Sequence, residues 1–218
     1  MRRKQHRFQH NREAHNVIER GKPLYTTIKG QWHEYFKNNN SLVLELACGK
    51  GEYTVGLAEN RPDVNIIGID IKGDRIARGS KRCIEKGLEN AAFLRTGIQF
   101  LEEFFEESSI EEIWLIHPDP QPRDKEEKRR LTNDHFLAEY KKYLKPGGKF
   151  ILKTDSPFLY EYTLEKLSDD ADFKIMGNTN DLYNSPLLED HYGIKTHYEG
   201  LWMEKGYTIN YIKCQLKN

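Results

Sequence analysis

The sequence is poor in cysteine and has no long apolar run, and both shortages exclude whole classes of protein. Its 218 residues include three cysteines, Cys48, Cys83 and Cys214, and no two of them form a C-x-x-C pair. An odd, widely spaced set favours reduced thiols over a disulfide framework or a zinc site. No apolar stretch approaches the length of a membrane span, and the opening MRRKQHRFQHNRE lacks the apolar core of a signal peptide. We therefore expect a cytoplasmic protein with no membrane partner.

Net charge is absent as well, yet the charges are unevenly distributed. The chain has 34 basic and 34 acidic residues, but residues 1–30 hold eight Lys or Arg against two Glu. This asymmetry indicates a polyanionic partner, although a solvated, disordered tail explains the first ten residues equally well. The side chains that we expect to bind phosphates there are Arg2, Arg3, Lys4 and Arg7.

Apolar runs and helical patterns alternate along the rest of the chain. Strands are predicted at 41–47, 64–71, 91–95, 110–117, 149–155 and 207–216. Helices are predicted at 25–38, 53–61, 74–88, 98–105, 132–145 and 158–170, the fifth capped by Thr132 or Asn133. The alternation predicts an α/β fold whose sheet is mostly parallel and covered on both faces. We expect a basic extension with a short amphipathic helix over residues 1–40 and a catalytic domain over 41–218.

The first predicted strand runs into a glycine turn, ELACGKG, at residues 45–51. A dinucleotide site would need a third glycine where Thr54 stands, and a P-loop would need a Lys followed by Ser or Thr. An acid at Glu45 suits a cofactor that carries an ammonium and a sulfonium. Asp70, which ends the second strand, could accept hydrogen bonds from ribose hydroxyls or merely cap the next helix. Together the two acids resemble the class I S-adenosylmethionine-dependent methyltransferases, with a nicotinamide-dependent dehydrogenase as the main rival.

The fourth strand is followed by HPDPQPRDKEEKRR, where an acid is enclosed by prolines and then followed by basic side chains. Pro118 and Pro120 fix the backbone on both sides of Asp119. A rigid loop leading into a solvated helix is the plain alternative. The adjacency instead favours a base held beside a phosphate backbone by the basic run Arg123, Lys125, Lys128, Arg129 and Arg130.

This segment resembles the P-D-P-W-P-K-K-x-H-x-K-R-R-L motif of the bacterial tRNA (guanine-N7-)-methyltransferase family. The similarity continues in order along the chain. LELACGKGEY is similar to the L-E-I-G-C-G-K-G-x-F turn of the family, GIDI to its G-I-E-I, and FILKTD to its h-x-h-K-T-D. KTHYEGLWMEKGYTIN is similar to its T-x-Y-E…G-x-x-I tail. The matches cover about residues 42 to 212.

The resemblance implies a Rossmann-like class I methyltransferase fold: a doubly wound, mostly parallel seven-stranded sheet with an antiparallel last strand. It implies S-adenosylmethionine as cofactor, tRNA as partner, and methyl transfer to N7 of a guanosine in the variable-loop region. By the same resemblance Asp119 is the active-site acid. Cofactor contacts fall at Glu45, Gly49, Gly51, Asp70, Ile71, Gly97 and Ile98. Contacts with the guanosine fall at Arg123, Asp155, Thr196, His197, Tyr198 and Glu199.

The chain departs from the family pattern at Gly97, Gln121, His197 and Gly200, which bears on the adenine and substrate contacts. Because guanine N7 carries no proton, Asp119 is expected to orient the base and to stabilise positive charge. The alternatives are a class I methyltransferase acting on another RNA base, an amino group or a small molecule, and a non-catalytic RNA-binding module on this fold. We expect no metal, since His117 and His191 are isolated, and a monomer or homodimer without an obligate protein partner.

Overall fold

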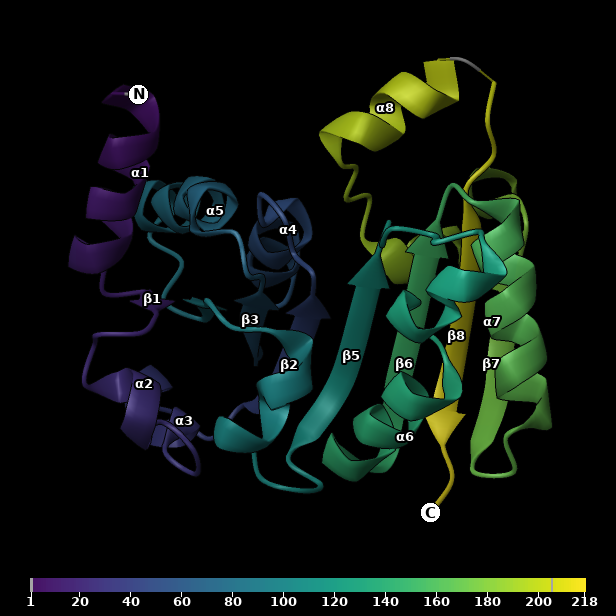
Figure 1. Cartoon of the computed structure of the whole chain (residues 1–218), viewed down its shortest axis with the longest axis horizontal. Helices are drawn as coiled ribbons and strands as arrows, with labels where there is room; N and C mark the ends of the chain where they lie inside the picture. The colour runs from purple at the N-terminus through teal and green to yellow at the C-terminus, as the bar shows by residue number, and fades with distance from the viewer. Residues whose placement is uncertain (1, 205) are drawn as a thin grey trace. The chain divides into compact units, whose positions relative to one another are not determined.

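The chain folds into two compact units, residues 1–106 and 107–218. The computed structural model describes residues 2–204 and 206–218, and among these the side chains of residues 2–4, 198 and 202–204 are left undescribed. Figure 1 shows the elements of both units. No helix in the described ranges is long and apolar enough to cross a membrane.

The sheet of the first unit consists of four parallel strands in the order β1-β4-β3-β2. These are β1 (Val17–Ile18), β2 (Ser41–Leu46), β3 (Val64–Ile69) and β4 (Ala91–Leu94). Every residue of β3 and β4 is buried, as expected of parallel strands that are covered on both faces. The two-residue β1 was not predicted, and it brings the described strands to eight where seven were expected.

The helices of the first unit are α1 (Arg2–Glu13), α2 (Leu24–Thr27), α3 (Trp32–Phe36), α4 (Glu52–Asn60), α5 (Gly73–Lys86) and the 3-10 helix η1 (Ile98–Glu103). The single helix predicted over 25–38 is wrong, because Gly30, with φ of 74°, separates α2 from α3. Residues 98–105 were expected to form a helix, and 98–103 form a 3-10 helix.

The N-terminal segment is an integral part of the first unit. Helix α1 packs against α5 (Figure 1). The Asn11 side chain donates to the Gly73 carbonyl at 2.8 Å, and Asn16 donates to the Ser80 carbonyl at 3.1 Å. The described part of the basic N-terminus is therefore helical, in contrast to the disordered tail that the sequence alone left open.

The sheet of the second unit has the order β5-β6-β8-β7. Its strands are β5 (Ile110–Ile116), β6 (Leu144–Thr154), β7 (Phe173–Thr179) and β8 (Asn210–Leu216). Strands β5 and β6 are parallel, whereas β8 runs antiparallel to both β6 and β7. The predicted antiparallel last strand is thus confirmed, but strand β7 was missed.

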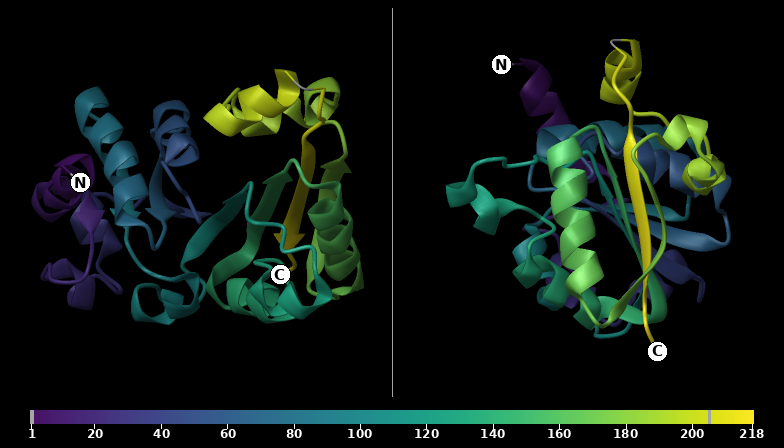
Figure 2. Two further views of the ribbon diagram at one scale, coloured as in Figure 1. Left: turned by 45° about the horizontal axis from the view of Figure 1, so that its top comes forward. Right: turned by 90° about the vertical axis from the view of Figure 1, so that its right-hand side faces the viewer.

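The helices and 3-10 turns of the second unit are η2 (Asp124–Arg129), α6 (Asp134–Tyr143), α7 (Pro157–Asp169), η3 (Leu182–Asn184), η4 (Pro186–His191) and α8 (His197–Glu204). Helix α7 lies along strands β7 and β8 (Figure 2). Asn133 caps α6 by accepting from the Phe136 amide at 3.0 Å, and Ser156 caps α7 by accepting from the Leu159 amide at 3.2 Å. Of the two caps considered for α6, Asn133 is the one observed. Both caps fix helix starts that follow candidate site loops.

Candidate functional site

The candidate cofactor residues lie at the carboxyl ends of three neighbouring parallel strands in the first unit. Glu45 is the second-last residue of β2, and it lies opposite Gly68 in the parallel pairing of β2 with β3. Asp70 follows β3 directly, and Gly97 is the third residue after β4. Because parallel strands end at the same edge of a sheet, these residues share one edge, as predicted.

Glu45 is buried, with 3% of its surface exposed, and it holds the start of helix α4. One carboxylate oxygen accepts the Thr54 amide at 2.6 Å and also accepts the Thr54 hydroxyl. Burial raises the pKa of Glu45 to about 8, and the two Thr54 hydrogen bonds oppose the rise only in part. Thr54 therefore serves as a hydrogen-bond donor to Glu45, at the position where a dinucleotide site would carry glycine.

The glycine turn has three residues with left-handed backbone conformations, Ala47 with φ of 56° and two glycines. Gly49 has φ of 55° and Gly51 has φ of 66°. A Cβ at Gly51 would lie 2.5 Å from Cε1 of Phe93, so only glycine fits there. At Gly49 the nearest atom to an added Cβ is 4.0 Å away, and the conformation alone favours glycine.

Asp70 ties the glycine turn to the end of β3. Its Oδ2 accepts from the Gly49 amide at 2.9 Å, and its Oδ1 accepts from the Lys72 amide at 2.7 Å. Lys72 precedes the first residue of α5, so the helix-capping interpretation of Asp70 holds in part. Each carboxylate oxygen has two lone pairs, and hydrogen bonds with ribose hydroxyls are compatible with these contacts.

The remaining cofactor candidates differ in accessibility. Ile71 exposes 62% of its surface directly after Asp70, which is unusual for a large apolar side chain. Gly97 is buried as the N-cap residue of η1, and Ile98 is half-buried. An exposed apolar side chain beside a carboxylate can pack against a planar base while the carboxylate binds the attached sugar.

In the second unit, Asp119 is exposed on the loop that follows β5. The residues two positions away on either side are His117 and Gln121, with φ of 45° and 48°. Left-handed conformations cost a non-glycine residue roughly 1 kcal/mol or more, so surrounding contacts must hold this loop in place.

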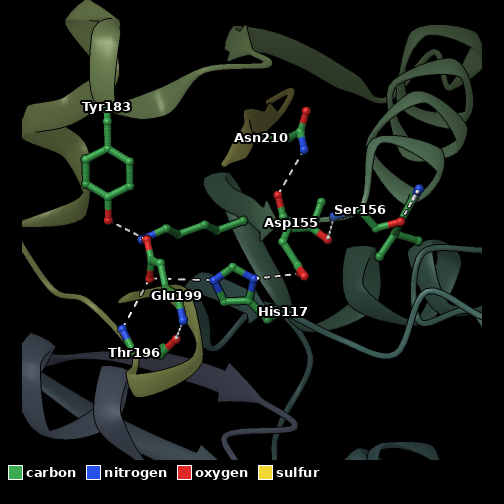
Figure 3. A network of polar contacts seen from close by, with 10 residues as sticks. His117, Asp155, Ser156, Tyr183, Thr196, Glu199 and Asn210 are labelled. Atoms are coloured by element: carbon green, nitrogen blue, oxygen red, sulfur yellow. Dashed lines mark hydrogen bonds and ion pairs between the residues drawn. The ribbon is translucent and has the colours of Figure 1, made fainter. Parts of the chain in front are cut away.

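His117 connects two of the residues expected to bind the guanosine (Figure 3). Its Nδ1 lies 3.2 Å from Oδ1 of Asp155, which follows β6, and its Nε2 lies 3.6 Å from Oε2 of Glu199 in α8. Glu199 is fully buried and pairs with the equally buried Lys153 at 2.5 Å between Nζ and Oε1. The Tyr183 hydroxyl donates to the same carboxylate. Lys153 and His117, which can both carry a proton, therefore face two carboxylates.

The charges of this cluster shift one another's pKa values. Burial would raise the pKa of Glu199, but His117, Lys153 and Tyr183 outweigh it and lower that pKa to about 2. The hydrogen bond from His117 lowers the pKa of Asp155. Burial opposes the imidazolium, yet Asp155 and Glu199 raise the pKa of His117. Burial lowers the pKa of Lys153 to about 8. Both carboxyls are thus held as anions.

The start of helix α8 has a reciprocal capping arrangement. The Glu199 amide donates to Oγ1 of Thr196 at 3.2 Å, and the Thr196 amide donates to Oε2 of Glu199 at 3.2 Å. This is the capping box formed by a T-x-x-E sequence. His197 is exposed in the first turn. Tyr198 was also expected to contact the substrate, but its side chain lies outside the described residues.

The basic run after Asp119 is exposed at four of its five positions, Arg123, Lys125, Lys128 and Arg129. Arg123 forms an ion pair with Glu126. Arg130 is buried, with 4% of its surface exposed, so it differs from the other four cations that were expected to lie beside a phosphate backbone.

Sequence reasoning missed several members of the site. Thr54, Lys153 and Tyr183 were not singled out, and His117 was treated as an ordinary polar residue. Lys153 offered a signal, because a lysine inside the apolar run FILKTD must find a buried partner. His117 and Tyr183 offered none, since their partners lie 16 to 82 residues away in the chain.

Comparisons with known proteins place the chain among methyltransferases. Residues 39–212 match the family model Methyltransf_4, described as "Putative methyltransferase". A tRNA (guanine-N(7)-)-methyltransferase of Cytophaga hutchinsonii is 48% identical over 98% of this chain and 97% of its own. A second, from Christiangramia forsetii, is 45% identical over 97% and 96%.

Solved structures resemble the fold at much lower sequence identity. The 16S rRNA methyltransferase KamB superposes with a TM-score of 0.63 at 12% identity, over 87% of this chain and 94% of the other. An rRNA methylase from Streptococcus thermophilus gives 0.57 at 15%, over 92% and 100%. These likenesses confirm the Rossmann-like methyltransferase fold that the sequence predicted.

Proposed function

The chain belongs to the tRNA (guanine-N7-)-methyltransferase family, and from this premise we propose that it transfers a methyl group from S-adenosylmethionine to N7 of a guanosine in tRNA. The proposal is carried by similarity over almost the whole chain to relatives that bear this name. The family resemblance implies a variable-loop guanosine as the target, and a tRNA substrate supports the proposal that the enzyme acts in the cytoplasm.

The first unit would hold S-adenosylmethionine, which supplies a methyl group bonded to a positively charged sulfur. The residues there fit such a molecule. Glu45 is a buried carboxyl whose pKa is raised to about 8, so a cationic ligand nearby would gain from its ionisation. The Asp70 oxygens each keep a lone pair that could accept from a hydroxyl donor, and Ile71 presents an exposed apolar surface. The glycine turn at Gly49 and Gly51 lets a ligand approach the backbone closely.

The second unit would bind the guanosine. The Watson–Crick edge of guanine presents N–H donors at N1 and N2, and carboxylates are the complementary acceptors. Asp155 is half-buried and held as an anion by His117, which prepares it for that task. Glu199 was also expected to contact the guanosine, but it is fully buried, so we propose that it holds His117 beside Asp155. Thr196 accompanies them at the start of α8.

Asp119 would act through its charge. N7 of guanine has a free lone pair and no proton, so the reaction needs no general base. Methylation leaves a positive charge on the imidazole ring of the base, and a carboxylate fixed beside it stabilises that charge. Holding N7 in line with the methyl group is the other main contribution that the chain would make.

The exposed cations would bind the tRNA backbone. Arg123, Lys125, Lys128 and Arg129 lie on and beside η2, a few residues after Asp119. Such contacts orient the RNA without reading its sequence. Arg7 of α1 was also expected to contact phosphate. In the structure its Nη1 lies 3.8 Å from Oδ2 of Asp74. Arg2, Arg3 and Lys4 have side chains outside the described residues.

The test is methyl transfer from labelled S-adenosylmethionine to bulk tRNA that lacks 7-methylguanosine, followed by nucleoside analysis. We expect 7-methylguanosine as product, a strong loss of turnover in Asp119→Asn, and near-normal cofactor affinity in that variant. Asp124→Asn is the matched control, because Asp124 is an exposed acid on the same segment. Tight cofactor binding without transfer to tRNA would show that the substrate is wrong. Full turnover by Asp119→Asn would show that the assigned acid is wrong.

A further inference from the structure

Arg130 differs from the other cations of the basic run in that it is turned into the protein. It exposes 4% of its surface, while the side chain of Arg123 exposes 66%. Arg129, its neighbour in the chain, is exposed. A guanidinium withdrawn from solvent has to be satisfied by fixed partners, because it stays charged at every pH at which proteins fold.

Those partners are carbonyl groups of the loop that carries Asp119. Nε of Arg130 donates to the Gln121 carbonyl at 3.0 Å. Nη2 donates to the carbonyls of Arg123 at 3.3 Å and Pro122 at 3.5 Å. The planar fork of one side chain thus holds three consecutive residues.

The loop needs such a tether for two reasons. Gln121 has a left-handed backbone with φ of 48°, a conformation that a side chain other than glycine leaves readily when nothing restrains it. Pro120 and Pro122 have no amide hydrogens, so this stretch has few backbone donors with which to hold itself.

The other side of the guanidinium rests on helix α7. It lies over the rings of Phe158 and Tyr162, at 4.8 and 4.6 Å from their centroids. The Tyr162 hydroxyl donates to Oε1 of Glu127 at 3.0 Å, and Nη1 of Arg130 is 3.9 Å from the same oxygen. Helix α7 begins two residues after Asp155, so Arg130 joins the loop after β5 to the helix that follows Asp155.

We propose that Arg130 is a positioning residue, which fixes the Asp119 loop against α7, and that it is not a ligand of tRNA phosphates. This inference rests on the proposed function for the role of Asp119. The donors of Arg130 already serve carbonyl groups and Glu127, and both ring contacts would be lost if the side chain turned to solvent. A displacement of about 1 Å in a group that acts in the transition state lowers turnover on the order of 100-fold.

The decisive variant is Arg130→Lys, which keeps the charge but loses the planar fork and the ring stacking. We expect kcat to fall roughly 10- to 100-fold while KM for tRNA changes little. A lysine would serve a phosphate almost as well as an arginine, so an unchanged kcat overturns the proposal. Glu165→Gln, an exposed change on α7, is the control and should keep the kcat of the unaltered enzyme.

The salt dependence of tRNA binding separates positioning from phosphate contact. Each phosphate contact adds about 0.9 to the slope of log K against log salt concentration on a duplex. Arg129→Gln should lower that slope by about one contact and weaken binding. Arg130→Gln should leave the slope unchanged, and a slope lowered as in Arg129→Gln would identify Arg130 as a phosphate ligand.

A measurement that does not depend on turnover separates the proposed role of Arg130 from the proposed enzymatic function. Amide hydrogen exchange at Glu126, whose amide donates to the Arg123 carbonyl at 2.8 Å, should quicken in Arg130→Lys and, to a smaller extent, in Phe158→Leu, which removes one ring without touching a polar group. Unchanged exchange in both variants overturns the tether. Quickened exchange in a protein that methylates no tRNA supports the tether and refutes the proposed function.

Discussion

Replacing Glu45 by glutamine is expected to stabilise the protein at neutral pH while removing most of its affinity for S-adenosylmethionine. The perturbation is nearly isosteric. A glutamine oxygen can accept the same hydrogen bonds from the Thr54 amide and hydroxyl that the carboxylate accepts. What changes is the ionisation, since the glutamine stays neutral at every pH.

The magnitude follows from the raised pKa. Burial moves the pKa of Glu45 from 4.5 to about 8. In the unfolded chain the carboxyl loses its proton above pH 4.5, whereas in the folded protein it keeps it until about pH 8. Between these values the folded state binds more protons, so stability falls as pH rises. At about 1.4 kcal/mol per pH unit, the cost at pH 7 is roughly 3 kcal/mol.

The assay is thermal unfolding of both proteins, without cofactor, at a series of pH values. At pH 7 Glu45→Gln should melt roughly 6 to 12 °C above the unaltered protein, given about 2–4 °C per kcal/mol for a chain of this size. The difference should vanish near pH 4.5 and level off above pH 8. Equal melting temperatures across this range would refute the reasoning, because they would mean that the buried carboxyl costs nothing.

Binding of the cofactor should show the opposite dependence on pH. An ammonium beside Glu45 favours the ionised carboxylate, so binding releases a proton below pH 8, and affinity should rise with pH up to that value. Titration calorimetry in buffers of different ionisation enthalpy counts the released proton. A proton count of zero at pH 7 would show that Glu45 does not face the positive end of the ligand.

Two further predictions concern packing and the buried ion pair. Gly51→Ala should destabilise the protein by about 2 kcal/mol or more in chemical unfolding, because the added Cβ would lie 2.5 Å from Phe93 at a residue with positive φ. Gly49→Ala meets no close atom and should cost only about 1 kcal/mol. Equal losses of stability in the two variants would contradict the steric argument. Lys153→Met should cost about 3–5 kcal/mol, because the buried Glu199 carboxylate loses its lysine partner. The double variant with Glu199→Gln should recover much of that loss, and a strictly additive loss would show that the two side chains do not interact.

The sequence was a reliable guide where structure depends on local pattern. Apolar runs indicated β2 to β6 and β8, and the glycine turn and Asp70 followed strands whose ends had to share an edge. The sequence did not predict strands in which the apolar pattern was interrupted or short. Strand β7 has one fully buried residue, Phe173, beyond which half-buried and exposed residues alternate, and β1 has only two residues.

The chemistry of individual side chains divides in the same way. The order of residues determined that an acid follows each of several strands and that prolines enclose Asp119, because strand ends and turns are set by neighbours in the chain. Only the tertiary structure decided that Glu45 binds Thr54, that His117 joins Asp155 to Glu199, and that Arg130 is withdrawn from the basic run. Burial and partners arise from segments tens of residues apart, and charge or pKa cannot be assigned until those segments meet.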